Sequence, residues 1–197
     1  MLNLTRLADP AFFSQNAVIV AQQLLGKYLI RIIDGKQIIC KIIETEAYDG
    51  PADDANHGFN NKRSFRNETL FWQGGYAHIF MIYGMYFCFN IVTDQVDYPS
   101  AVLLRAGEII LDETIPNFIS KPNLANGPGK LSRYLKINKT DDGLDLIKSS
   151  TLYLGQETIP SVFDITTTPR VNIDYATNFK LKPYRFYITN HKAVSKK

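Results

Sequence analysis

"KYLIRIIDGKQIICKIIETEAY", which runs from Lys27 to Tyr48, is the stretch that decides the fold. It contains two apolar runs rich in β-branched residues, separated by Asp34-Gly35. Asp-Gly between two such runs is the strongest short signal for a tight β-hairpin. The stretch therefore predicts two long antiparallel strands, around which the rest of the chain must be arranged.

The second of these strands ends in two acids and a phenol. Because residues two apart share a face of an extended strand, Glu44, Glu46 and Tyr48 are expected on one face. A lone acid at a strand end is usually solvated, and that is the ordinary interpretation of each acid alone. Tyr48 on the same face, and His57 in the loop that follows, indicate a functional site instead.

The remaining helices and strands are predicted from weaker signals of the same kind. Asp9 with Pro10 and Asn16 are typical helix starts, and Asn67 is expected to cap a short helix over 68–73. Gly84-Met85 is expected to join two strands in a second hairpin. Further strands are predicted at 76–83, 86–92, 100–106 and 184–188, and a helix at 130–137. The pattern is that of an α+β protein with peripheral helices and a mainly antiparallel, curved sheet.

Length and composition indicate one ordinary globular domain over residues 1–197. The chain is 45% hydrophobic and 21% charged, and Cys40 and Cys88 both lie within apolar runs, as buried thiols of a reducing compartment do. Its start lacks the pattern of a secretory signal, and its apolar runs are too short to span a membrane. A cytoplasmic protein is expected, with residues 188–197 as a basic, partly flexible tail.

The positive charge is unevenly distributed, although the net charge is only +3. One basic group follows the first hairpin (Lys62, Arg63 and Arg66), another has helical spacing (Lys130, Arg133 and Lys136), and seven Lys or Arg against one acid lie from Arg170 onward. Each group alone is most simply a solvated face, but together they favour a polyanionic partner. The three histidines and two cysteines lack metal-ligand spacing, so neither a metal nor a cofactor is expected.

Six blocks of sequence then occur in one order along nearly the whole chain. They are "ETEAYDGPADDANH" with the later Arg66-Asn67, "YGMYFCFN" (83–90), "VLLRAGE" (102–108), "GPGKLSRYLKI" (127–137), "TPRVNI" (168–173) and "RFY" (185–187). In this order they resemble the alkyladenine, or 3-methyladenine, DNA glycosylases of the vertebrate and bacterial type. No single block is sufficient for the resemblance, but the ordered set is specific.

The resemblance implies a monofunctional enzyme of base-excision repair. Such an enzyme binds damaged double-stranded DNA from the minor groove, flips an alkylated purine out of the stack and hydrolyses its N-glycosidic bond, leaving an abasic site. It implies a single α+β domain with a curved antiparallel sheet or open barrel and a protruding β-hairpin. It also implies a monomer that needs no cofactor or membrane and, in a bacterium, works at the nucleoid.

By resemblance, Glu46 is the catalytic acid. It is expected to activate a water and to stabilise the oxocarbenium-like sugar, with a pKa raised by apolar surroundings. Arg105 and the backbone carbonyl of Val171 match the other contacts of that water. Glu44 matches an acid without a chemical role, so we expect it to be structural. Taken alone, Arg105 would be interpreted as an ordinary surface or salt-bridged arginine.

The resemblance also assigns the base pocket. Tyr48, His57 and Phe80 match the three rings that sandwich the flipped base, and Asn90 matches the residue that excludes the 2-amino group of guanine. Phe80 replaces a frequent tyrosine, so stacking is kept and a phenol hydrogen bond is lost. Taken alone, Phe80 would be a core aromatic, His57 a loop residue and Asn90 a strand residue bonded to nearby backbone.

Two further sets of residues are expected to contact DNA. Tyr83, assisted by Met85, matches a wedge that enters the minor groove at the vacated base position. Arg66, Lys130, Arg133 and Arg170 are expected to hold phosphates. The alternative for the hairpin tip is a hydrophobic turn packed under a loop.

The sequence leaves two alternative functions open and differs from the family pattern in two further places. A damage-binding module would need the rings but not Glu46 or Arg105, and a glycosidase acting on free nucleosides or sugars would use a pair of carboxylates such as Glu44 and Glu46. Phe65 stands where the family often has proline, and the loop 115–126 matches nothing. Whether 7-methylguanine, hypoxanthine and ethenoadenine are substrates beside 3-methyladenine is open, and no proton donor for neutral bases is evident.

Overall fold

The hairpin predicted around Asp34-Gly35 forms the centre of the structure, a computed structural model that describes residues 3–82 and 84–196. Strands β2 (Tyr28–Ile33) and β3 (Lys36–Asp49) pair antiparallel. The two turn residues have φ of +50° and +76°, the left-handed conformation that a two-residue hairpin turn requires. This prediction is confirmed.

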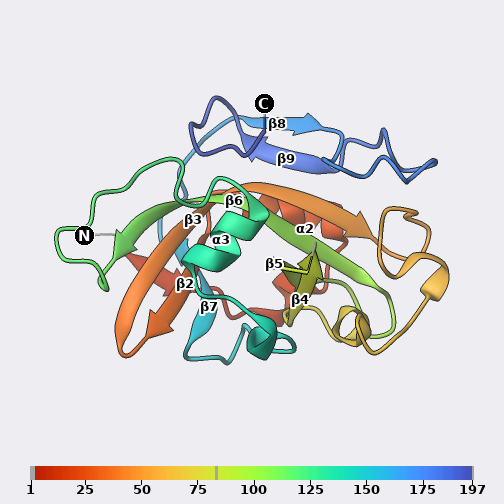
Figure 1. The fold of residues 1–197 in the computed structure, drawn as a ribbon, viewed down its shortest axis with the longest axis horizontal. Helices are drawn as coiled ribbons and strands as arrows, with labels where there is room; N and C mark the ends of the chain where they lie inside the picture. The colour runs from red at the N-terminus through yellow and green to blue at the C-terminus, as the bar shows by residue number, and fades with distance from the viewer. Residues whose placement is uncertain (1–2, 83, 197) are drawn as a thin grey trace.

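The strands form one curved, unclosed sheet (Figure 1). Their order is β1-β7-β2-β3-β6-β5-β4, while β9 pairs with both β3 and β8, and every pairing is antiparallel. The additional strands are β1 (Leu4–Arg6), β4 (Ala77–Ile82), β5 (Tyr86–Val92), β6 (Ser100–Asp112), β7 (Leu152–Glu157), β8 (Ile165–Thr168) and β9 (Arg185–Ile188). The predicted α+β class with a curved, mainly antiparallel sheet in a single domain is confirmed.

The helices are short and lie at the periphery of the sheet. They are α1 (Pro10–Phe13), α2 (Ala17–Leu24) and α3 (Pro128–Tyr134), with 3-10 turns η1 (Phe59–Asn61), η2 (Glu68–Phe71) and η3 (Lys139–Asp141). The side chains of Asp9 and Asn16 accept the N–H groups of Ala11 and Val18, so both predicted caps are confirmed. Each satisfies a backbone donor that a helix start leaves without an intrahelical partner.

Asn67 does not cap η2, contrary to the prediction. Its side-chain oxygen accepts the N–H of Ser64, and its nitrogen donates to the carbonyls of His57 and Lys62. The asparagine faces backward along the chain and closes the loop that carries His57. A local cap signal was therefore overridden by a loop contact ten residues away.

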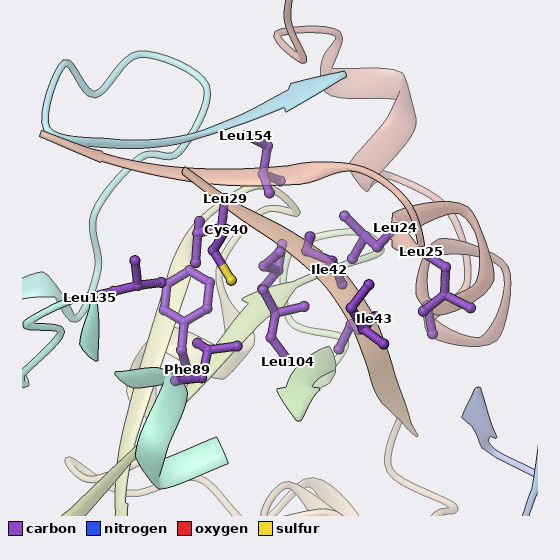
Figure 2. Packing of buried hydrophobic residues seen from close by; sticks show 14 of the residues in the cluster. Leu24, Leu25, Leu29, Cys40, Ile42, Ile43, Phe89, Leu104, Leu135 and Leu154 are labelled. Atoms are coloured by element: carbon purple, nitrogen blue, oxygen red, sulfur yellow. The ribbon is translucent and has the colours of Figure 1, made fainter. Parts of the chain in front are cut away.

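The core fills the space between the sheet and the two longer helices. Figure 2 shows Leu24 and Leu25 of the α2 end beside Ile42 and Ile43 of β3, and Phe89 beside Leu135 beyond α3. Ile42, Ile43 and Leu104 are fully buried. Burial on both faces of β3 makes its position rigid, which matters because its far end carries the acids.

Irregularities in β3 and β6 occur at the acids themselves. Ile42 pairs with Gly107, Glu44 with Ala106, and the next residue of β3 already pairs with Leu104, so Ile43 and Arg105 each have no directly opposed partner. Such bulges bend a strand and change the direction of a side chain. At the same place β3 gains a second neighbour, because Glu44 also pairs with Tyr187 of β9.

The predicted flexible tail is not what the structure shows for residues 188–196. Ala193 and Val194 are buried in the core, and the N–H of Ser195 donates to Glu44 at 2.7 Å. The segment thus packs against β3 because it supplies apolar side chains and a donor to a buried carboxylate. In the described part of the chain, no helix has the length and apolar character needed to cross a membrane.

Candidate active site

A cavity of about 480 Å³ opens where β3 ends and β4, β5 and β6 come together. Loop residues 55–57, 171–173 and Tyr175 contribute to its wall. A volume in this range is typical of a site for a small organic group. Tyr48, His57, Phe80, Asn90, Arg105 and Val171, six of the residues that sequence analysis proposed for chemistry or base binding, line it together.

Glu46 lies directly behind this wall. Its side chain is fully buried, and its carboxylate accepts the Val171 N–H at 2.7 Å, the Tyr48 hydroxyl at 3.0 Å and Arg105 Nη1 at 3.4 Å. Burial raises the pKa of Glu46, while Arg105, the Val171 N–H and the Tyr48 hydroxyl oppose the rise. The arrangement is a buried carboxylate held by three groups that all face the cavity.

The backbone of Val171 has a contact beyond the predicted one. Its carbonyl remains the predicted partner of the water, and the structure shows that its N–H donates to Glu46 Oε1. The position is therefore in contact with the acid, but through a donor that stabilises the ionised carboxylate.

Glu44 is the fully buried centre of an ion-pair network. Its Oε1 accepts Arg185 Nε at 2.7 Å and Arg105 Nε at 3.2 Å. The same Arg105 contacts Glu46, so one guanidinium joins the two acids. The bulge at Arg105 explains this geometry, because an unopposed residue on β6 can direct its side chain across the end of β3. This arrangement fits the structural role expected of Glu44.

The three rings of the cavity are not equivalent. The rings of His57 and Phe80 contact each other, with centroids 3.9 Å apart and planes tilted by 32°. A flat base cannot enter between those two rings, so they form one unit of the cavity wall, which Tyr48 also lines. The Arg170 guanidinium lies 4.7 Å from the centre of the Tyr48 ring and holds that ring from outside the cavity wall.

Asn90 lies in the cavity wall on β5, directly opposite His78 of β4. Its amide nitrogen donates to the carbonyls of His78 at 3.0 Å and Cys88 at 3.3 Å. The local backbone role that sequence analysis considered is thus present, and it fixes the orientation of the side chain toward the cavity.

His78 is a cavity residue that the sequence analysis missed. Its Nδ1 lies 2.7 Å from the Thr69 hydroxyl, which itself donates to Asp142 at 3.1 Å. Because a carboxylate only accepts, the hydroxyl proton goes to Asp142 and His78 donates from Nδ1. Burial lowers the pKa of His78 to about 4, so the ring is neutral. Alternation with Phe80 along β4 was the signal that could have placed it.

Arg170 requires a correction. Its side chain is fully buried and forms two bonds to Asp53, at 2.5 and 2.8 Å, with a third to the Ala47 carbonyl at 2.9 Å. A guanidinium committed to a buried carboxylate is not available to a DNA phosphate. Arg170 was predicted to hold a phosphate, and no local sequence pattern indicates its pairing with Asp53, which lies 117 residues away.

The other predicted DNA contacts lie outside the cavity. Arg66, Lys130 and Arg133 are exposed. Met85 is 67% exposed at the tip of the β4–β5 hairpin, where its N–H donates to the Ile82 carbonyl across the turn. This exposure does not fit the alternative of a tip packed under a loop. Tyr83, the proposed wedge, lies outside the described residues.

Comparison with known proteins identifies the family. A family model described as methylpurine-DNA glycosylase matches residues 11–192. The chain belongs to the methylpurine-DNA glycosylase family. It is 42% identical to a protein of Natranaerobius thermophilus over 95% of this chain and 98% of that protein, and 43% identical to one of Borrelia garinii subsp. bavariensis over 96% and 100%. A Bacillus thuringiensis protein is 42% identical over 96% of this chain and 99% of its own length. All three carry the provisional name 3-methyladenine DNA glycosylase.

Membership of the methylpurine-DNA glycosylase family makes the chain a DNA glycosylase, an enzyme of base-excision repair whose substrate is damaged DNA. The recognition made from the six ordered blocks is therefore confirmed. Neither a non-catalytic damage-binding module nor a glycosidase of free nucleosides fits this family. Within the part of the chain that the structure describes, no group of three or more His, Cys, Asp or Glu is placed to hold a metal ion.

Proposed function

We propose that this glycosylase flips an alkylated purine, 3-methyladenine first among them, from duplex DNA into the cavity and hydrolyses its N-glycosidic bond with a water activated by Glu46. The observation that carries the proposal is the position of Glu46. It is fully buried directly behind a cavity whose wall supplies all three of its partners. Those partners favour its ionised form, which is the form that a general base requires.

The proposed reaction needs few catalytic groups besides Glu46. A 3-methylated adenine carries a positive charge, and its departure as a neutral base makes it a good leaving group. The enzyme then needs a base for the proton of water and a negative charge near the developing oxocarbenium ion. One carboxylate can supply both.

Two residues of the cavity wall define the path by which a water would reach Glu46. Arg105 and Val171 both line the cavity and both contact the carboxylate. The contact from Arg105 is the longest of the three, at 3.4 Å. A water entering between Arg105 and Val171 can therefore reach the carboxylate with a small movement of the guanidinium.

Base selection would use the rings and Asn90. A flipped purine stacked between Tyr48 and the His57–Phe80 pair gains about 1–3 kcal/mol per base from stacking. A cationic base gains a further cation–π attraction that an undamaged base lacks. Asn90, held by two backbone carbonyls, would disfavour the 2-amino group of guanine by steric conflict. Release of hypoxanthine and ethenoadenine belongs to the same proposal as secondary activities, and release of 7-methylguanine, which carries that amino group, is expected to be slower than release of 3-methyladenine.

The DNA would approach the exposed side of the hairpin. We place Met85, with Tyr83, in the minor groove, and Arg66, Lys130 and Arg133 on the phosphates. A monomer is sufficient in this arrangement because the residues of one chain form the cavity, the wedge and the cationic contacts.

The deciding experiment is release of free 3-methyladenine from alkylated duplex DNA by the purified chain. Chromatographic detection of the free base, with an abasic site left in the strand, is the expected result. Binding of the damaged duplex without release would favour a binding module. Release from free nucleosides but not from duplex DNA would favour a nucleoside glycosidase.

The pH dependence of base release should report the raised pKa of Glu46. Burial raises this pKa above the ordinary glutamate value of about 4.3. Because the ionised form is the base, the rate should fall as pH drops through the raised value, and the acid limb should lie above that ordinary value. Burial lowers the pKa of His57, so any contribution from that ring to the profile would lie below the ordinary histidine value of about 6.5. A single-turnover rate profile checks this, and a rate that is flat down to the ordinary glutamate value would contradict it.

Replacing Met85 with alanine should weaken action on duplex DNA. The side chain is 67% exposed and apolar at a hairpin tip, so its removal costs the folded protein little but takes away part of the wedge. We expect roughly tenfold weaker binding of a lesion-containing duplex, since about 1.4 kcal/mol corresponds to that factor. The matched control is Ile19→Ala on α2, where an equally apolar side chain is 47% exposed. Equal binding by the two variants would remove Met85 from the DNA interface.

A further inference from the structure

Glu44 has one oxygen that depends on the last described residues of the chain. Its Oε1 accepts from Arg185, from Arg105 and from the Ser195 hydroxyl, the last at 3.0 Å. Its Oε2 accepts the Ser195 N–H at 2.7 Å, and no other donor to that oxygen exists among the described residues. A fully buried carboxylate oxygen without a donor is costly, so Ser195 completes the site of Glu44.

Arg105 is shared between the two acids. Its Nε contacts Glu44 at 3.2 Å, its Nη1 contacts Glu46 at 3.4 Å and its Nη2 contacts the Ser195 hydroxyl at 3.4 Å. A hydroxyl can accept and donate at once, so Ser195 accepts from Arg105 and donates to Glu44. If Glu44 lost the bond from the Ser195 hydroxyl, it would compete more strongly with Glu46 for the guanidinium that the two acids share.

The segment that carries Ser195 is itself firmly attached. Ala193 and Val194 are buried, and Arg185 Nη2 donates to the carbonyl of Lys196. His191 Nε2 lies 3.3 Å from a carboxylate oxygen of Glu108 on β6. Ser195 is thus held at a fixed position by both the core and the ion-pair network.

We propose that Ser195 is a positioning residue for the glycosylase reaction: by satisfying Glu44, it leaves Arg105 free to hold Glu46 at the cavity wall. The inference rests on the proposed function of Glu46. It assigns a role to a segment whose described residues do not line the cavity.

The consequence is a change in the titration of Glu46. The groups nearest to it are Glu44 and Tyr48 on β3, Arg105 on β6 and the Val171 N–H. Cys88 on β5, Arg170 and Tyr175 are also close enough to interact with its charge. Arg105 is the strongest of the influences that lower the pKa of Glu46, and burial and Glu44 raise it. Drawing Arg105 toward Glu44 should therefore raise this pKa and move the acid limb of the rate profile to higher pH.

The test compares Ser195→Ala with Ser195→Thr, which keeps the hydroxyl, and with Lys192→Ala, an exposed change on the same segment. Single-turnover release of 3-methyladenine at saturating enzyme is measured across pH, because that rate constant is independent of the fraction folded. For Ser195→Ala we expect roughly tenfold slower release on the acid side, as for one lost bond to a charged group. The acid limb should move upward, duplex binding should be unchanged, and the threonine variant should restore the rate.

A second readout separates this inference from the proposed function. The carboxyl titration of Glu46, followed by ¹³C NMR and assigned with Glu46→Gln, does not depend on activity. An upward shift in Ser195→Ala alone supports the role of Ser195 even if the intact chain releases no base. An unshifted titration, or equal effects of the alanine and threonine variants, would overturn it, because the segment would then act through packing alone.

Discussion

Replacing Glu46 with glutamine is expected to abolish base release while lesion binding is retained. Glutamine has nearly the same shape, and its oxygen can still accept the Val171 N–H, so the cavity should keep its form. What is lost is the negative charge and the ability to take a proton. Removing a general base costs about 10²–10⁴-fold, and loss of the buried charge adds to that. Release of 3-methyladenine from alkylated duplex DNA measures the rate, and binding of a lesion duplex checks the site.

Glu44→Gln is the matched control for this change. Glu44 lies two residues earlier on the same strand, is equally buried and shares Arg105 with Glu46. We expect this variant to lose stability, because Glu44 pairs with two guanidiniums, yet to retain measurable release. If Glu44→Gln abolished release and Glu46→Gln did not, the roles assigned to the two acids would be reversed. If neither affected release, another group would have to activate the water.

The sequence was sufficient for those parts of the fold that depend on neighbouring residues. The Asp34-Gly35 turn and the two N-caps follow from local backbone chemistry, and each appears in the structure. The placement of Glu44 and Glu46 toward one network also follows from strand periodicity, even though β3 is irregular there. Strand β6 continues past its predicted end to Asp112. Gly107 permits the close approach of β6 to β3 there, because a Cβ at this position would lie only 2.2 Å from Cys40 Sγ.

The sequence was not sufficient where a side chain finds a distant partner. The bulge at Arg105 arises from the pairing of β3 with β6, which no local pattern encodes. Ser195 bonds to Glu44 across 151 residues, and this bond turns an expected flexible tail into part of the core. The sequence alone predicts that a basic, polar segment is solvated, because it does not reveal the buried carboxylate to which the segment binds.

In the candidate cavity, too, some features could be predicted from the sequence and others could not. Resemblance placed Tyr48, His57 and Phe80 together, but the direct contact between the last two rings required coordinates. His78 escaped notice because a histidine within an apolar strand is usually a satisfied core residue. Its neighbour Thr69 fixes its tautomer from a different part of the chain.

Replacing Asp53 with alanine is expected to cause the largest loss of stability among the changes considered. Asp53 and Arg170 are both fully buried side chains joined by two hydrogen bonds. Removing one partner of a buried pair leaves an uncompensated charge, which costs about 3–5 kcal/mol in the free energy of unfolding. For a chain of this length that corresponds to a fall in Tm of roughly 10 °C. Thermal and urea unfolding at neutral pH measure it.

An exposed ion pair provides the control. Glu68 contacts Arg63 at 2.5 Å, but both side chains are more than 40% exposed. Glu68→Gln should therefore leave the unfolding midpoint nearly unchanged, since solvent already screens that attraction. A loss for Asp53→Ala as small as for Glu68→Gln would mean that Arg170 finds water or another acceptor, and that its burial is not maintained in solution.

The double variant Asp53→Ala with Arg170→Met distinguishes a buried structural pair from a phosphate contact. If the cost of Asp53→Ala is that of an unpaired buried guanidinium, removing the guanidinium as well should recover much of the lost stability. If Arg170 instead held a DNA phosphate, its loss would reduce the salt dependence of duplex binding by about 0.9 in log–log slope. Recovery of stability with an unchanged salt slope is the expected result. It would establish that this arginine is a structural residue behind the cavity wall, where its guanidinium lies 4.7 Å from the centre of the Tyr48 ring on which the flipped base is proposed to stack.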